Sequence, residues 1–136
     1  MPVEVAGDIK RGRVYGAWCF HVEQVDATTA DVITTITPGF VGTIEKVLWV
    51  QGTPVTTAGD GININLEINA VNLVGGVVAL TSALCTPLGV VIEGTPVSGS
   101  NNFNRTDTVS VEAAIGAGQF AEGGGTLVVI YSQKLR

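Results

Sequence analysis

The clearest pattern in the sequence is an alternation of apolar and polar residues between Gly61 and Ala70. The two parities hold different residue types: Ile62, Ile64, Leu66, Ile68 and Ala70 on one, and Asn63, Asn65, Glu67 and Asn69 on the other. A period of two places these sets on opposite faces of a β-strand, one face buried and one in water. We therefore predict a half-buried strand here.

Similar short segments, rich in β-branched and aromatic residues, recur along the chain between clusters of Gly, Pro, Asn and Ser. Besides 61–70, we predict strands over residues 14–25, 31–37, 42–51, 77–84, 89–94, 108–115 and 125–132. Such segments are typical of strands, and a helical period is hardly present anywhere. The chain is predicted to be all-β, with about eight strands.

Eight short antiparallel strands favour a two-sheet β-sandwich, and the jelly roll is the eight-stranded member of that class. An immunoglobulin-like sandwich is the alternative, although the interval between Cys19 and Cys85 lacks a tryptophan where such domains place one. Residues 1–13 show mixed charge and no sustained period. We predict an N-terminal arm over 1–13 and a single β-sandwich domain over 14–136.

The segment 42–51 is apolar on both parities. Leu48 and Val50 share a parity with Ile44 and Lys46, while Val47 and Trp49 share theirs with Thr43, Glu45 and Gln51. A strand that is apolar on both faces is usually buried on both. We expect four residues to lie at a subunit interface or in the core: Val47, Trp49, Val128 and Ile130.

The composition indicates that the domain associates with other protein subunits. Only 14% of the residues are charged, against a typical quarter, and the net charge is -5. A small domain with so little charge exposes much apolar surface, so we expect a homo-oligomer or an assembly component. Nucleic acid is not expected as a partner, because phosphate neutralisation requires a basic surface.

No apolar run reaches the length of a membrane span, and the charged N-terminus does not resemble a signal peptide. We expect no membrane association and synthesis in the cytoplasm. Cys19 and Cys85 are too few for a disulfide scaffold and are expected to be buried and unpaired.

The inventory of reactive residues argues against an enzyme. His21 is the only histidine, so a multi-histidine metal site cannot form, and no serine stands in a nucleophile-elbow context. A paired-carboxylate site remains open with Glu67, Glu93 and Glu112, but each also fits the polar face of a predicted strand. We expect no catalytic residue, no metal and no cofactor.

The order of strands and turns resembles a known family. The resemblance lies in the succession GFVGTIEKVLWV, GDGININLEIN, LTSALCTPLGVVIEGTPVSG, DTVSVEAA and FAEGGGTLVVIY. This succession is similar to the small jelly-roll decoration, or cement, proteins on the heads of tailed bacteriophages. The resemblance covers roughly residues 14–133 and includes no catalytic or ligand motif.

The resemblance implies a structural role in the virion. Proteins of this kind bind the outer surface of an expanded capsid as homotrimers, bridge neighbouring major capsid protein subunits and stabilise the shell. We expect the capsid contact to include Lys10, Arg11 and Arg13 of the arm, with Tyr15 beside them. The expected partners are the major capsid protein and further copies of this chain.

A binding module is the competing class. A trimeric receptor- or glycan-binding head of a phage fibre would display an aromatic side chain among polar loop residues. Phe103, flanked by Asn101, Asn102 and Asn104, is the candidate cluster for that function.

Overall fold

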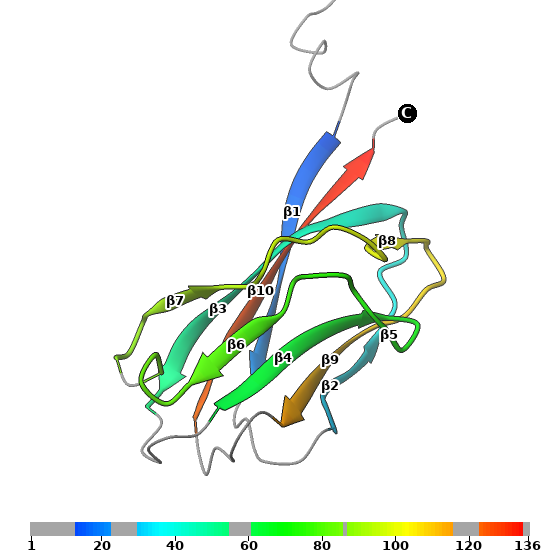
Figure 1. The fold of residues 1–136 in the computed structure, drawn as a ribbon. Coiled ribbons are helices and arrows are strands. Elements are labelled where there is room, and N and C mark those ends of the chain that lie inside the picture. Colours follow the sequence, from blue (N-terminus) through cyan, green and yellow to red (C-terminus); the bar gives the residue numbers. More distant parts are fainter. Residues whose placement is uncertain (1–12, 23–29, 55–60, 86, 116–122, 135–136) are drawn as a thin grey trace, which may run out of the picture.

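The computed structural model describes residues 13–22, 30–54, 61–85, 87–115 and 123–134, and these fold as two antiparallel β-sheets packed face to face (Figure 1). The described residues contain no helix. The predicted all-β sandwich is confirmed. The predicted arm, apart from Arg13, lies outside the described residues.

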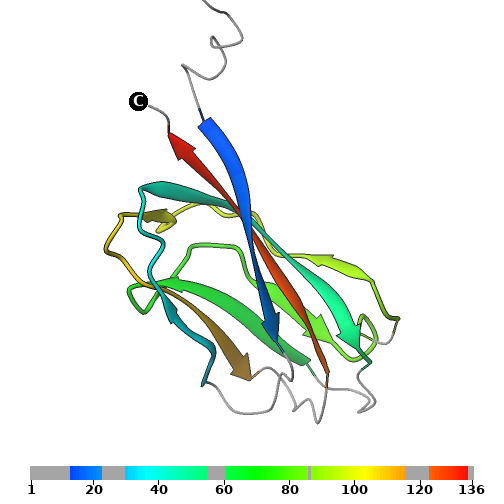
Figure 2. The ribbon, with the colours of Figure 1, turned by 180° about the vertical axis from the view of Figure 1, so that it is seen from behind.

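Sheet A consists of β1 (Arg13–Val22), β10 (Gly124–Lys134) and β3 (Gly42–Thr53), in that order. Two short strands, β7 (Val91–Glu93) and β8 (Asn102–Phe103), both pair with β3. Thr43 pairs with Ser132 of β10 and with Asn102 of β8, so β7 and β8 follow the edge of β3 that β10 leaves free. In Figure 2, β1 and β10 lie in front.

Sheet B consists of β2 (Ala30–Ile36), β9 (Val109–Ile115) and β4 (Gly61–Ile68). The short strands β5 (Val71–Asn72) and β6 (Val78–Thr81) follow the far edge of β4 in the same way. Each pair of short strands therefore acts as one broken strand. Counted so, the ten strands become the eight that the sequence predicts.

The strand order is that of a jelly roll. Strands β1, β3, the β7–β8 pair and β10 belong to sheet A, whereas β2, β4, the β5–β6 pair and β9 belong to sheet B. The connection from β4 to the β5–β6 pair stays within sheet B. Every other connection crosses from one sheet to the other. This arrangement is the double Greek key of the jelly roll rather than an immunoglobulin-like order.

The two broken strands meet and close one side of the sandwich. The amide nitrogen of Val74 donates to the carbonyl oxygen of Gly99 at 2.8 Å, and that of Gly76 donates to Thr95 at 2.8 Å. This close approach of the two broken strands requires glycine at position 75. Gly75 has φ +85°, and a Cβ there would lie 1.9 Å from the carbonyl oxygen of Pro96. Gly75 and Gly76 thus allow the two broken strands to join the sheets on this side.

The core fills the space between the sheets. The apolar parity of β4 is buried, with Ile62, Ile64, Leu66 and Ile68 turned toward sheet A. Strand β4 ends at Ile68, two residues before the predicted end, because Asn69 and Ala70 have positive φ and form the turn to β5.

Aromatic rings fill the end of the core near β8. The rings of Trp18, Phe40, Phe103 and Tyr131 lie against one another, and the Trp18 and Tyr131 centroids are 4.8 Å apart. Deeper in the core, the indole nitrogen of Trp49 donates to Oε1 of Gln51 at 2.7 Å, which satisfies two polar groups that are out of contact with water.

A β-bulge in β3 changes which of its residues face the core, so the predicted assignment of residues to its two faces was partly wrong. Opposite β10 the register shifts, so that Tyr131 pairs with Ile44 and Ile130 with Lys46, and Glu45 is the extra residue. The bulge places Ile44 on the same buried face as Val47, Trp49 and Gln51, whereas simple alternation predicted Ile44 on the opposite one. Leu48 and Val50 face outward with Lys46.

Candidate interaction surface

The outer face of sheet B is polar. Nδ2 of Asn65 on β4 donates to Oε1 of Glu112 on β9 at 3.2 Å, and Oγ of Ser110 donates to Oε2 of Glu67 at 3.1 Å. The polar side chains of β4 thus pair across the sheet with those of β9. Asn65 and Glu112 are half-buried, whereas Glu67 and Ser110 are buried, and these cross-strand contacts satisfy their polar groups.

The outer face of sheet A is mostly apolar. Because Trp18, Phe20 and Val22 of β1 pack toward the core, the residues between them point outward. The cross-strand register then aligns the outward side chains in rows: Ala17 with Ile130, Cys19 with Val128 and Leu48, and Val50 with Val91. Ala17, Cys19 and Val91 are exposed, and the other four are half-buried. We call these seven side chains the apolar face.

The charged side chains at the border of the apolar face form ion pairs with one another. Nζ of Lys46 lies 3.0 Å from Oε1 of Glu93, and the Arg13 guanidinium lies 3.6 Å from Oε2 of Glu45. The buried hydroxyl of Ser132 joins the second pair, accepting from Arg13 and donating to Glu45. Each of these two ion pairs is electrically neutral.

The N-terminal end of β1 exposes apolar side chains on both faces. Tyr15 points outward and is 63% exposed, and Val14, although on the inward parity, is 46% exposed. The reason is visible in Figure 1, where the ends of β1 and β10 extend beyond sheet B as a two-stranded ribbon. Of the predicted capsid-contact residues, Arg13 and Tyr15 lie on this ribbon, whereas Lys10 and Arg11 fall outside the described residues.

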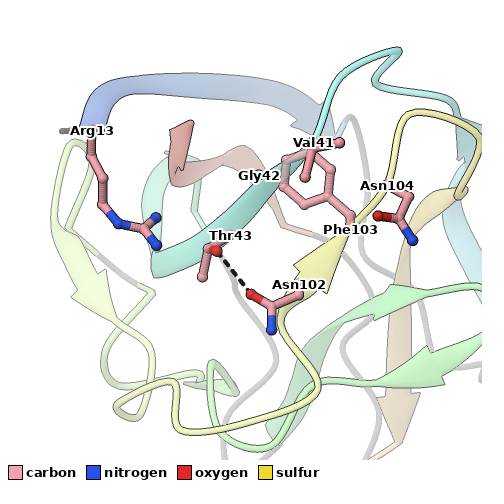
Figure 3. A pocket seen from close by; sticks show the side chains of 7 residues that line it. All are labelled: Arg13, Val41, Gly42, Thr43, Asn102, Phe103 and Asn104. Carbon is pink, nitrogen blue, oxygen red and sulfur yellow. Dashed lines mark hydrogen bonds between the residues drawn. The ribbon is translucent and has the colours of Figure 1, made fainter. Parts of the chain in front are cut away.

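A shallow hollow of about 180 Å³ lies beside the ribbon, between β1, β3 and β8 (Figure 3). It is lined by Arg13, Val41, Gly42, Thr43, Asn102, Phe103 and Asn104. The hydroxyl of Thr43 donates to Oδ1 of Asn102 at 2.8 Å across one side of the hollow. Phe103 is only 1% exposed and serves the aromatic core, so its ring offers no open platform.

The remaining candidate residues do not converge on a reactive centre. His21 is an exposed residue on β1, and Glu93 is paired with Lys46. Glu67 and Glu112 each accept a hydrogen bond on sheet B and line neither the hollow above nor a second one of about 310 Å³ around Glu93. No group of three or more His, Cys, Asp or Glu residues in the described part of the chain could hold a metal ion.

The two cysteines differ in environment. Both are free, and Cys85 is buried as predicted, but Cys19 is exposed on the outer face of β1. The prediction for Cys19 was wrong because the strand is apolar on both parities, and the larger Trp18 and Phe20 take the inward one. Burial raises the pKa of the Cys85 thiol to about 11.

The predicted interface residues divide between the two faces of sheet A. Val47 and Trp49 belong to the core, whereas Val128 and Ile130 lie in the apolar face. Sequence reasoning did not single out Ala17, Leu48 or Val91 for that face. The segments 14–22 and 42–51 are apolar on both parities, which is the sequence signal for this face. Only the pairing of β1 and β3 with β10 shows that the outward sides of these segments belong to one surface.

Comparisons with known proteins place the chain in no family. No family model and no curated protein matches it. A solved structure described as "Crystal Structure of FLHE" is similar over 89% of this chain and 98% of its own, with 14% identity and a TM-score of 0.33. At that TM-score the likeness supports no argument about function. No helix in the described residues is long and apolar enough to cross a membrane.

Proposed function

We propose that this protein is a structural virion component, a decoration protein that binds the outer surface of a tailed-phage head and stabilises the shell by bridging major capsid protein subunits. The jelly-roll order of the strands agrees with the family that the sequence resembles. The polar groups described above are engaged in pairs within the fold, an arrangement that suits a scaffold better than a reaction centre.

The observation that carries the proposal is the projecting end of β1. Val14 and Tyr15 expose apolar surface on opposite sides of a two-stranded ribbon, and Arg13, which is paired with Glu45, stands at its outer end. Such a ribbon can lie between two neighbouring shell subunits and contact each with one face. Aromatic and arginine side chains supply much of the binding energy in protein interfaces.

The test is binding of the purified protein to expanded heads of the encoding phage that lack it. Tyr15→Ser should weaken binding by about tenfold or more, because it removes a large contact side chain. Val71→Ser, at a position on β5 that is 57% exposed, is the matched control and should bind as the wild type does. Unchanged binding of Tyr15→Ser, with Val14→Ser also unchanged, would exclude the ribbon as the contact.

A receptor- or glycan-binding head is the second candidate, and the hollow in Figure 3 is the place to test it. Asn102, Asn104 and Thr43 provide amide and hydroxyl groups that suit a polyhydroxylated ligand. The buried position of Phe103 counts against it, because sugar binding commonly uses an exposed ring. A glycan array screened with the wild type and with Asn102→Ala separates the two candidates: ligand-specific signal lost in the variant would favour this function.

A further inference from the structure

We infer that the free edge of β1 binds an extended segment of a major capsid protein subunit, which adds to sheet A as one further strand. The inference rests on the proposed function, because it names the part of the shell partner that binds beside the projecting ribbon. An added strand is held through its backbone hydrogen bonds, and its alternate side chains supply specificity.

The first argument is that the edge of β1 lacks the usual protection against strand pairing. In the described part of the chain, β1 pairs with β10 alone, and the register of that pairing is unbroken from Arg13 to Val22. Edge strands usually carry a lysine, a proline or a bulge that discourages another strand. Residues 14–22 contain no lysine and no proline. This edge is therefore open to a further strand.

The second argument concerns the direction of the backbone groups, which can be followed from β3. The carbonyl oxygen of Val47 accepts from the amide nitrogen of Gly94 at 2.8 Å, and the amide nitrogen of Gln51 donates to Val90 at 3.0 Å. Both residues of β3 thus bond on the side of β7. Because the direction alternates along an antiparallel strand, Leu48 bonds on the side of β10.

The same alternation continues through β10 to β1. Val128 pairs with β3 through its backbone, so the next residue, Val129, bonds toward Trp18 of β1. The amide and carbonyl groups of the alternate residues of β1 therefore point away from β10, into the free edge. These residues are Tyr15, Ala17, Cys19 and His21, and all four are exposed.

The third argument is that half-buried apolar side chains line the same side of the sandwich. The broken strands join the sheets on the opposite side, so β1 and β2 are the two open edges. Trp18 and Phe20, the inward residues of β1, are only half-buried, and so are Ile33 and Ile36 of β2. On the joined side, Val78 of β6 is fully buried. We therefore expect apolar residues at alternate positions of the partner segment, covering this opening.

The two open edges differ, which favours a single extended segment over a second copy of the domain. A second copy would bring its own β1 and β2 to this side together. The register of β2 with β9 shifts twice, between Asp31 and Ile33 and between Ile33 and Ile36, so the edge of β2 is irregular. An extended segment requires the edge of β1 alone, and that edge continues into the projecting ribbon.

The experiment measures hydrogen exchange at residue resolution in the intact protein, free and bound to expanded heads that lack it. In the free protein, the amides of Ala17, Cys19 and His21 should exchange rapidly, whereas those of Trp18 and Phe20, which bond to β10, should exchange slowly. Binding to heads should slow exchange at Ala17, Cys19 and His21 by about tenfold or more.

Ala17→Pro provides a second readout. Proline removes the amide hydrogen at the free edge and leaves the ladder with β10 in place, so head binding should weaken by about tenfold or more. Ala79→Pro is the matched control on the joined side of the sandwich. Ala79 is exposed, and its amide points away from β4, as the bond from Thr95 to the Val77 carbonyl shows for that parity. Ala79→Pro should bind as the wild type does, and thermal unfolding establishes that both variants are folded.

Two results would overturn the inference and leave the proposed function standing. One is a wild type that binds heads while its edge amides still exchange rapidly, and the other is a folded Ala17→Pro that binds like the wild type. Protection of the same amides in the protein alone, rising with its concentration, would assign the edge to a second copy and would also overturn the inference. A wild type that does not bind heads would reject the proposed function, and the inference with it.

Discussion

Leu48 and Val128 are direct neighbours across β3 and β10, and both side chains point away from the core. Inward neighbours on the same strands, such as Trp49 and Leu127, are fully buried. The central strands of sheet A are therefore apolar on both faces. That arrangement and the projecting end of β1 support the proposal that this protein is an assembly component.

Gly75→Ala should destabilise the fold strongly. The position combines φ +85° with a Cβ that would lie 1.9 Å from the Pro96 carbonyl oxygen, so the contact between the broken strands must open. We expect a loss of about 3 kcal/mol or more in the free energy of unfolding, measured by urea titration.

Gly89→Ala is the matched control for Gly75→Ala. Gly89 has φ +75° with open space around it, so only the backbone strain of about 1–2 kcal/mol applies. Equal losses at the two glycines would show that Pro96 yields freely and that the close approach does not stabilise the sandwich.

Trp49→Ala should reduce the free energy of unfolding by about 3–5 kcal/mol, since the side chain is fully buried between the sheets. Trp49→Phe keeps most of the apolar contact but leaves Oε1 of the buried Gln51 without its donor. Its expected cost is about 1–3 kcal/mol. A near-neutral Trp49→Ala would contradict the position of this ring in the core.

Cys85 should resist alkylation at neutral pH, whereas Cys19 of the dilute protein should react readily. Burial raises the pKa of the Cys85 thiol to about 11, so almost none of it is the reactive thiolate at pH 8. Mass spectrometry after a short exposure to iodoacetamide should find one modification, at Cys19. Denatured protein should take up two, and rapid modification of Cys85 in the folded protein would contradict its burial.

Asp107 should make the turn before β9 sensitive to acid. Its carboxylate accepts from Nδ2 of Asn69 at 3.0 Å and from the amide nitrogen of Asn104 at 2.8 Å, which lowers the pKa of Asp107 below its ordinary 3.8. A lowered folded-state pKa contributes stability above the unfolded value, and that stability is lost as the pH falls through the folded value.

Asp107→Asn should therefore be less stable than the wild type at neutral pH. The gap in urea midpoint should close as the pH falls through the lowered pKa of Asp107, where the wild-type carboxylate becomes protonated. Asn69→Gly, which keeps the positive φ and removes the donor, should reduce the same pH dependence. A gap that is constant with pH would show that the carboxylate charge plays no part.

Ala70→Gly should stabilise the protein by on the order of 1 kcal/mol. Asn69 and Ala70 form a two-residue turn between Ile68 and Val71, with φ +53° and +63°. Glycine takes that conformation without the steric cost that alanine has. Ala79→Gly, an exposed position within β6, is the control and should lose about 0.5–1 kcal/mol. A loss at both positions would contradict the turn geometry.

The sequence was sufficient for the fold class and most strands, because period-two alternation depends only on which face meets water. It was insufficient where a local irregularity of the backbone interrupts the alternation of inward and outward residues. One extra residue at Glu45 moves Ile44 to the other parity, and no signal within 42–51 distinguishes this bulge from an evenly apolar strand. The positive φ of Asn69 and Ala70 likewise ends β4 earlier than the alternation does.

The candidate surface was predictable only in part. Val128 and Ile130 stood out as apolar residues of a late strand, but their adjacency to Ala17, Cys19 and Leu48 depends on the jelly-roll order, which places β10 between β1 and β3. Phe103 shows the converse. Its polar neighbours favoured an exposed loop aromatic, yet the short β8 pairing with Gly42 and Thr43 turns the ring into the core.

The measurement that tests the proposed function most directly is quantitative mass spectrometry of purified particles of the encoding phage, comparing this chain with the major capsid protein. We predict an abundance within a few-fold of the shell protein, as a decoration role requires. A few copies per particle, or none, would contradict that role.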